Sequence, residues 1–284
     1  MKLAYIIQAH KGFKQLSTLI DILSKNSDVY LHIDLKNNDL YKQLKEHYLT
    51  QDNIFIISDR VSVNWSGFSQ VKATLNLLRA VKGKNYDYIS LLSGQDLPIK
   101  SHSEIIRFLS QDVHREFIHI APDYKNYSWR LLRYSPWSES KSIRNFPLNK
   151  LNSVSIKLQN LLNIKKPFFN DLDIYMGSSW FTITNDAVEY ILNSVDNKLI
   201  EGFRSTTCSD EHFIQTLLMN SPFKEKVVGE NTVYIDWSEG NPNPKILTMN
   251  DYSKLKNSTK LFARKFDIDI DSDVINKIIK DEFK

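Results

Sequence analysis

The sequence predicts an α/β fold with a mostly parallel central sheet flanked by helices. In the first third of the chain, short apolar runs rich in β-branched and aromatic residues alternate with helical patterns. This alternation is typical of strand-helix-strand units whose strands run parallel and are covered on both faces. The 284 residues are 42% hydrophobic and 25% charged, which is enough to bury one large core. We therefore expect a single domain over residues 1–284.

The expected elements of this first part follow one another in a regular order. Helices are expected where apolar residues recur at a spacing of three or four, as Val71, Leu75 and Leu78 do. The expected strands are LAYIIQA (3–9), VYLHID (29–34), IFIIS (54–58) and YDYISLLS (86–93), and the expected helices are 13–24, 40–49 and about 67–80. In such sheets ligands collect at the carboxyl ends of the strands.

The second part of the chain is less regular. From about Asp123 to Leu151 it is rich in aromatic and basic residues, as in YKNYSWRLLRYSPWS, and shows no clean period. We interpret this segment as a long functional loop, because it lacks the Gly and Ser runs of a linker. Beyond it we expect an amphipathic stretch around 151–163, a strand after Gly177, helices from about 185 and about 209, and a terminal loop and helix.

Composition excludes several classes of protein. The formal net charge of +4 is too small and too evenly spread for a nucleic-acid groove. The single cysteine, Cys208, rules out a disulfide framework and a cysteine-rich zinc site. No apolar run approaches the roughly 18 residues of a membrane span, and the N-terminus is typical of a first strand rather than a signal peptide. A reducing interior is therefore the expected compartment.

The sequence has neither of the common phosphate-binding loops. Both G-x-G-x-x-G and G-x-x-x-x-G-K are absent, which disfavours a dinucleotide-binding dehydrogenase and a P-loop enzyme. A nucleotide would then need other cations for its phosphates. Lys245 in NPNPKIL and Lys265 in FARKFD are the candidates, although surface lysines are usually only solvated.

Two acidic residues are candidates for chemistry. Asp34 ends the second expected strand, where an Asp usually caps a turn but can also contact a ligand. In CSDEHFIQTLL, Ser209 or Asp210 is the expected N-cap of a helix, with Glu211 in its first turn. Glu211 would then either complement the helix dipole or serve as a general base in the cleft.

Several blocks together resemble the core-2/I-branching β-1,6-N-acetylglucosaminyltransferase family, which also contains the peptide O-xylosyltransferases. The blocks occur in the order of the family and run across nearly the whole chain. They are HIDLK (32–36), VNWSGFSQVKATLNLL (63–78), YISLLSGQDLPIKS (88–101), MGSSWFTIT (176–184), SDEHFIQTLL (209–218) and LFARKFD (261–267). LSGQDLPIK and FARKFD carry most of the signal. Among these proteins the chain looks like a bacterial-type member.

The resemblance implies a GT-A-like nucleotide-sugar transferase fold, with a nucleotide-binding half (1–122) and an acceptor-binding and catalytic half (123–284). It implies inverting transfer from a UDP-sugar, of N-acetylglucosamine above all, to a hydroxyl of a glycan. By motif position Glu211 matches the family's catalytic base and Asp34 its nucleoside-binding acid. Lys265 matches the diphosphate-binding lysine, and Lys245 stands where animal members have arginine, so the bidentate fork is lost.

Further donor and acceptor residues follow from the same resemblance. Trp65 and Asp96 are expected to shape the donor pocket. Indole platforms flanked by charged donors suit sugars, whereas core packing is the alternative for each tryptophan. The expected acceptor-binding residues are Arg133, Trp237, Trp129, Arg130 and Ser178. Gly177 and Ser178 would let the backbone approach the substrates closely.

The resemblance also implies catalysis without a cofactor or a divalent metal. The string Asp171-Leu172-Asp173 and the later DIDIDSD spell the D-x-D of metal-dependent GT-A enzymes. Neither is well placed relative to the expected strands, so we interpret both as solvated turns. The histidines show no ligand spacing, and we assign no metal site.

The expected partners are a UDP-sugar and a glycan acceptor, with a lipid-linked acceptor as one form of it, and no nucleic acid. We expect a cytoplasmic enzyme of surface-polysaccharide synthesis, with peripheral contact at the inner face of the cell membrane as a further expectation. The alternatives are a transferase of the same family that uses UDP-xylose, UDP-glucose or UDP-galactose, and a non-catalytic glycan-binding protein on the same fold. Residue types alone do not choose between them.

Overall fold

A computed structural model describes residues 1–283 and has a seven-stranded central sheet in the order β3-β2-β1-β4-β7-β6-β8. Its strands are β1 (Leu3–Ala9), β2 (Asp28–Ile33), β3 (Ile54–Ile56), β4 (Tyr88–Ser93), β6 (Glu116–His119), β7 (Phe181–Thr184) and β8 (Val227–Gly229). The strands β3, β2, β1 and β4 are mutually parallel, while β7 runs antiparallel to both β4 and β6. The predicted α/β architecture with a mostly parallel sheet is therefore confirmed.

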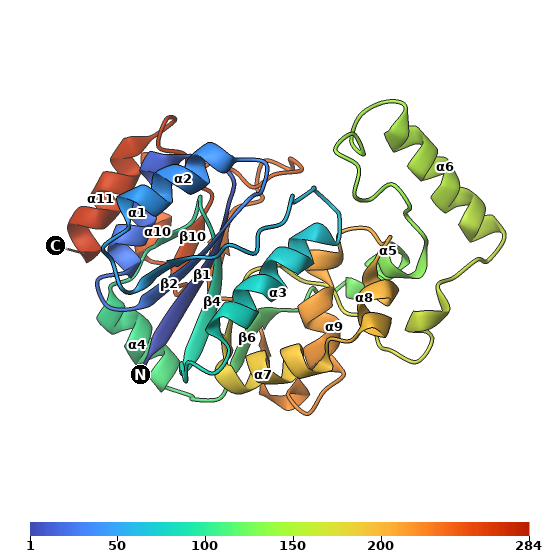
Figure 1. Cartoon of the computed structure of the whole chain (residues 1–284), viewed down its shortest axis with the longest axis horizontal. Coiled ribbons are helices and arrows are strands. Elements are labelled where there is room, and N and C mark those ends of the chain that lie inside the picture. Colours follow the sequence, from blue (N-terminus) through green and yellow to red (C-terminus); the bar gives the residue numbers. More distant parts are fainter. Residues whose placement is uncertain (284) are drawn as a thin grey trace.

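Helices flank this sheet (Figure 1). Against β1 and β2 pack α1 (Phe13–Leu23), α2 (Asn38–His47) and α3 (Ser69–Val81). The other helices are α4 (His102–Ser110), α5 (Trp129–Leu132), α6 (Leu148–Leu161), α7 (Asn185–Ser194), α8 (Asn197–Phe203), α9 (Phe213–Met219), α10 (Tyr252–Lys256) and α11 (Ser272–Glu282). No helix within residues 1–283 combines the length and the apolar character that a bilayer crossing requires.

A second, small sheet lies beside the first and joins β5 (Leu97–Pro98) to two strands from near the C-terminus. This sheet has the order β5-β10-β9, with β9 (Val233–Ile235) and β10 (Phe262–Arg264). The edge of the Phe262 ring packs on Tyr5 of β1, with ring centroids 5.8 Å apart. Gln15 of α1 is buried and bonds the backbone of Phe266 and Ile268. These contacts fix the chain after β10 over the edge of the main sheet.

Two sequence predictions need correction. The helix expected from about Ser209 begins later: Ser209–Glu211 form a 3₁₀ turn, and the α-helix starts at Phe213. The reason is that Asp210 accepts a hydrogen bond from the Ser179 hydroxyl instead of capping the helix. The segment expected to be a continuous loop over 123–151 contains the short helix α5 and the start of α6, which projects away from the sheet in Figure 1.

Candidate functional site

A cavity of about 740 Å³ lies at the carboxyl edge of the parallel strands. The ends of β1, β2 and β4 form its floor, through Ala9, Asp34 and Ser93. The loop before the antiparallel strand β7 enters from the same edge, and the turn at Asp210 and Glu211 and the end of β10 complete the lining. Both predicted halves of the chain therefore contribute to it, where sheets of this type are expected to bind ligands.

Asp34 lies on the floor of the cavity and is buried. Its backbone N–H donates to the carbonyl of Ala9 and so continues the pairing of β1 and β2 past their ends. One carboxylate oxygen accepts from the Lys36 N–H at 2.9 Å, and the other lies 3.4 Å from the Lys36 ammonium. The side chain thus caps the turn and also presents a carboxylate to the cavity.

A group of cations lines another part of the cavity. Lys265 follows β10, is half-buried, and has no ion pair within residues 1–283. Burial lowers the pKa of Lys265, and the charges of Arg264 and Lys11 lower it further. Lys11 lies 3.4 Å from Asp267, and Arg264 lies 3.3 Å from the buried carboxylate of Asp96. This excess of positive charge is the environment that a diphosphate requires.

Asp96 and Lys245 do not line the cavity. Asp96 is fully buried beneath it, where it accepts bonds from the Ser93 N–H and hydroxyl and pairs with Arg264. Lys245 lies 2.6 Å from Asp251, and this hydrogen bond raises the pKa of Lys245. The structure therefore brings Lys265 to the cavity but gives Lys245 a carboxylate partner of its own.

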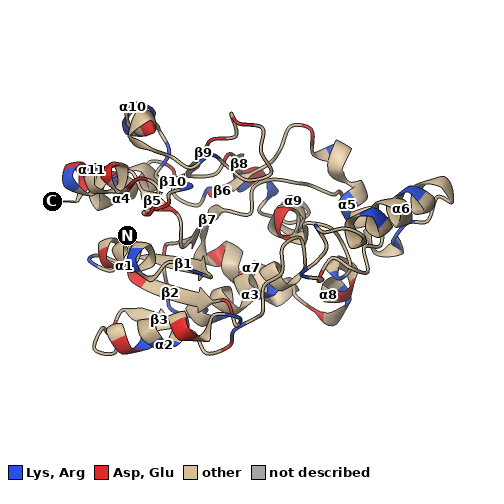
Figure 2. Cartoon of the chain, turned by 90° about the horizontal axis from the view of Figure 1, so that it is seen from above, with Lys and Arg blue, Asp and Glu red and all other residues tan. Residues whose placement is uncertain are grey.

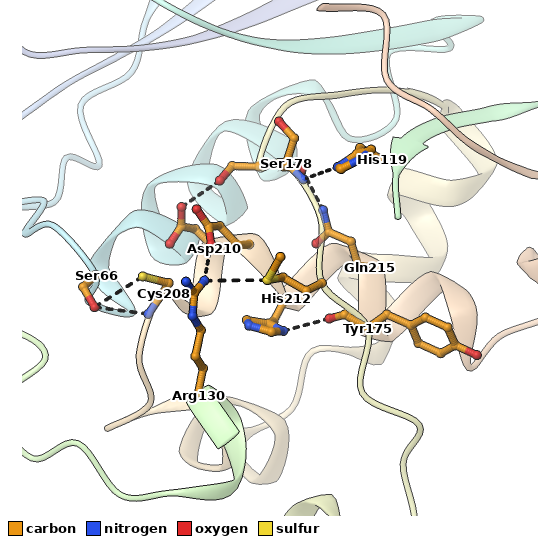
Figure 3. A network of polar contacts seen from close by, with 12 residues as sticks. Ser66, His119, Arg130, Tyr175, Ser178, Cys208, Asp210, His212 and Gln215 are labelled. Carbon is orange, nitrogen blue, oxygen red and sulfur yellow. Dashed lines mark hydrogen bonds and ion pairs between the residues drawn. The ribbon is translucent and has the colours of Figure 1, made fainter. Parts of the chain in front are cut away.

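Glu211 lines the cavity from the 3₁₀ turn that follows Cys208. Figure 3 shows Cys208 and Asp210 of this turn together with Arg130. Arg130 of α5 donates to its carboxylate at 2.5 Å. Loss of solvent and the neighbouring charge of Asp210 raise the pKa of Glu211 to about 7, and Arg130 opposes this shift. Loss of solvent also raises the pKa of Asp210. A carboxyl group poised near neutrality can accept a proton from a substrate hydroxyl.

The loop before β7 is held in place by its glycine. A Cβ on Gly177 would come within 1.7 Å of the His119 carbonyl oxygen, so no other residue fits without moving the backbone. The Gly177 N–H donates to the Glu211 carbonyl at 2.8 Å, which ties this loop to the turn with the carboxylate. Ser178 lines the cavity, and its N–H donates to the His119 imidazole at 3.2 Å. The close approach at Gly177 is thus to β6.

The predicted aromatic and basic residues divide into two groups. Trp65 and Trp237 line the cavity and are 52% and 54% exposed, although the Arg144 guanidinium covers one face of the Trp65 ring. Trp129 does not line it, and Arg133 turns away, donating to the side chain of Asn160 at 2.6 Å. Arg130, expected to bind acceptor, contacts Glu211 instead.

Some lining residues were missed by reasoning from sequence. Lys11 lies two residues after the first strand, so the strand-end argument used for Asp34 would have found it. Arg264 adjoins Lys265 in the same block. Asp210 adjoins Glu211 in a recognised block, but it was expected only as a helix cap. His119 carried no signal, because only the tertiary fold brings the end of β6 to this edge.

The acidic strings lie outside the cavity. Asp171 and Asp173 are exposed, and so is Asp269 in the later string. Within residues 1–283 no group of three or more His, Cys, Asp or Glu side chains has the arrangement of a metal site. Independence of metal stays a prediction.

A family model described as Core-2/I-Branching enzyme matches residues 3–257. The chain belongs to this family. The resemblance predicted from the sequence is thereby confirmed, and the predicted GT-A-like class agrees with the observed sheet.

Two relatives illustrate the range within the family. Xylosyltransferase 2 of Rattus norvegicus is 24% identical over 97% of this chain and 33% of its own length. The Homo sapiens N-acetyllactosaminide beta-1,6-N-acetylglucosaminyl-transferase is 28% identical over 76% of this chain and 52% of its own length. The chain thus spans about a third to a half of these relatives. A solved structure, mouse xyloside xylosyltransferase 1 in its apo form, aligns over 92% of this chain and 97% of that one with a TM-score of 0.41 and 9% identity.

Proposed function

We propose that this protein is an inverting, metal-independent glycosyltransferase that moves a sugar from UDP to a hydroxyl of a glycan acceptor. The observation that carries the proposal is that one cavity holds a carboxyl group with a pKa near 7, Glu211, and a half-buried amine, Lys265, that has no ion pair within residues 1–283. Inversion needs one base, and a departing diphosphate needs positive charge. The family and the transferase names of the relatives support the same reaction.

In this mechanism the acceptor hydroxyl attacks the anomeric carbon from the face opposite UDP. Glu211 accepts the hydroxyl proton as the new bond to the sugar forms. The bond between the sugar and UDP breaks at the same time, and its electron pair leaves with the diphosphate. Lys265 and Arg264 stabilise the charge that grows on the leaving group, so they favour the transition state over the ground state. Asp34, at the end of β2, would hold the nucleoside.

N-acetylglucosamine is the sugar we propose. The human relative is named for transfer of that sugar, whereas the rat relative is named for xylose, so UDP-xylose is the second candidate. Trp65 and Trp237 offer exposed aromatic faces for the sugar rings. We further propose a lipid-linked or surface polysaccharide acceptor and a cytoplasmic site of action.

A thermal-shift screen of UDP-sugars, with and without a chelator, tests the proposal. A donor that binds only the folded protein raises its melting temperature. A ligand at 100 times its Kd adds about 2.7 kcal/mol to the free energy of unfolding. We expect a shift with UDP-N-acetylglucosamine that the chelator leaves unchanged. Absence of a shift with every UDP-sugar, or loss of the shift on chelation, would contradict it.

Glu211→Gln separates the enzyme from a glycan-binding protein on the same fold. The amide cannot accept the proton, so transfer should fall by about 10²–10⁴-fold. The thermal shift with donor should remain, because Glu211 does not belong to the cationic part of the cavity. Unchanged transfer would remove Glu211 from the mechanism.

A further inference from the structure

Unlike an ordinary helix of a soluble protein, α6 exposes its apolar side chains. Its apolar side chains face outward: Leu151 is 51% exposed, Val154 61%, Leu158 52% and Leu161 81%. The spacing of these four residues places them on one stripe of the helix. Leu162, just after the helix, is 59% exposed and extends the stripe.

Polar side chains attach the opposite side of α6 to the body of the protein. Gln159 is buried, accepts from the Tyr134 N–H at 2.7 Å and donates to the Tyr134 carbonyl at 2.8 Å. Asn152 accepts from the Ser135 hydroxyl at 2.9 Å, and Asn160 accepts from Arg133. Polar contacts rather than burial of an apolar face therefore hold α6 in place. Its apolar stripe has no partner within residues 1–283.

The charge around this stripe has one sign. Residues 140–165 contain no Asp or Glu, and every basic side chain among them is exposed. These are Lys141, Arg144, Lys150, Lys157 and Lys165. Figure 2 shows the basic residues along α6, at the end of the molecule away from the C-terminus. An apolar stripe flanked by cations is the pattern of a helix that lies in a membrane interface.

We propose that α6 docks this protein on an anionic phospholipid bilayer, with the stripe Leu151, Val154, Leu158 and Leu161 inserted and the lysines on lipid phosphates. A second copy of the chain is a poorer occupant. A two-fold contact would place each exposed cation of residues 140–165 against the same set on the partner, with no carboxylate in this stretch to compensate. A bilayer supplies both the apolar phase and the negative charge.

The docking segment is also continuous with the cavity. Arg144, four residues before α6, stacks its guanidinium 3.4 Å from the ring centroid of Trp65, which lines the cavity. A bilayer under α6 would thus lie close to the segment that contacts the cavity wall. Lipid binding requires none of the proposed transfer chemistry. Binding to vesicles can therefore be tested independently of sugar transfer.

Flotation with vesicles tests the docking of the full chain. We expect the protein to float with vesicles of phosphatidylglycerol and phosphatidylcholine, to release in high salt, and to stay behind with phosphatidylcholine alone. Leu158→Ser with Leu161→Ser should weaken binding by about tenfold or more, because much of the inserted apolar surface is lost. Leu49→Ser is the matched control, since Leu49 is also 81% exposed but follows α2.

A charge-reversal pair tests the electrostatic part. Lys150→Glu with Lys157→Glu should weaken binding to anionic vesicles by about tenfold or more. Lys42→Glu with Lys45→Glu on α2 changes the net charge equally and should bind as the unaltered protein does. No flotation of the unaltered protein, or equal losses in the controls, overturns the proposal. So does a dimer in light scattering that the serine pair dissociates while lipids have no effect.

Discussion

At the scale of single residues, Glu211 is the base that we propose for the transfer. Its pKa near 7 results from loss of solvent and from Asp210, which together outweigh Arg130. Only the ionised carboxylate can take a proton, so kcat/KM should rise with pH up to about 7 and level off above it. This rising limb of the pH profile reports the titration of Asp210 and Glu211 together, because the two carboxyl groups interact. Rates of transfer between about pH 5 and pH 9 check this, and a flat profile would contradict it.

Arg130→Met tests how Glu211 is tuned. Arg130 lowers the pKa of Glu211, so its removal raises that pKa and should move the limb about one to two units to higher pH. The pH profile of kcat/KM measures the shift. Arg133→Met is the control, because Arg133 bonds Asn160 and does not touch Glu211. An unmoved limb in Arg130→Met would show that the ion pair does not form in solution. Reduced acceptor affinity in Arg133→Met would support its sequence-predicted role.

The two lysines predicted to bind diphosphate should differ when each is changed to Met. Lys265→Met removes a half-buried amine that lines the cavity, and the affinity for UDP should fall by about tenfold or more. Lys245→Met instead removes the partner of Asp251, so it should lower the free energy of unfolding by about 1–3 kcal/mol with a smaller effect on UDP. Calorimetry with UDP and urea unfolding measure the two effects. Equal losses of UDP affinity would restore Lys245 to the donor site.

At the scale of elements, the spacing of apolar residues predicted the strands and helices whose local sequence pattern is regular. The strand predicted at 3–9 has the same bounds as β1, and the helix predicted at 13–24 extends one residue beyond the end of α1. Periodicity does not report strand direction, so the antiparallel β7 could not be foreseen. The outward stripe of α6 was equally hidden, because an amphipathic pattern does not say which face is covered.

The candidate site could be predicted as far as its residues lie at strand ends or in recognised blocks. Asp34, Glu211, Lys265 and Trp237 meet in the cavity as their motifs suggested. The pairings Arg130 with Glu211 and Lys245 with Asp251 could not be predicted, since they depend on the path of irregular segments. Partners of charged side chains are set by tertiary contacts, which neither spacing nor composition encodes.

Gly177→Ala tests the loop that connects β6, β7 and the turn with Glu211. The added Cβ would overlap the His119 carbonyl, so the backbone must shift, at a cost of about 1–3 kcal/mol or more. The loss of free energy of unfolding should come with reduced transfer, because the Gly177 N–H bonds the Glu211 carbonyl. Gly83→Ala is the control: its φ of 71° makes alanine strained, but no atom lies within 4 Å of its Cβ, and it lies outside the cavity. It should lose stability without losing transfer.

At the scale of the whole molecule, the cavity depends on contacts between the two ends of the chain. Gln15 of α1 donates to the Phe266 carbonyl at 2.9 Å and accepts from the Ile268 N–H at 3.0 Å. These bonds hold the backbone directly after Lys265, so the N-terminal helix fixes the position of a cation from the last part of the sequence.

Gln15→Met keeps the volume of the side chain but removes both bonds. The Ile268 N–H loses its partner and the Phe266 carbonyl keeps only the bond from Gln95 at 3.2 Å, so the free energy of unfolding should fall by about 1–3 kcal/mol. The affinity for UDP should fall as well, because the backbone after Lys265 is held by fewer bonds, while the pH dependence set by Glu211 should not change. Gln159→Met is the matched control, since Gln159 makes two backbone bonds to Tyr134 beneath α6. It should lower stability without changing UDP affinity. If both variants weaken UDP binding alike, general destabilisation rather than the position of Lys265 explains the loss.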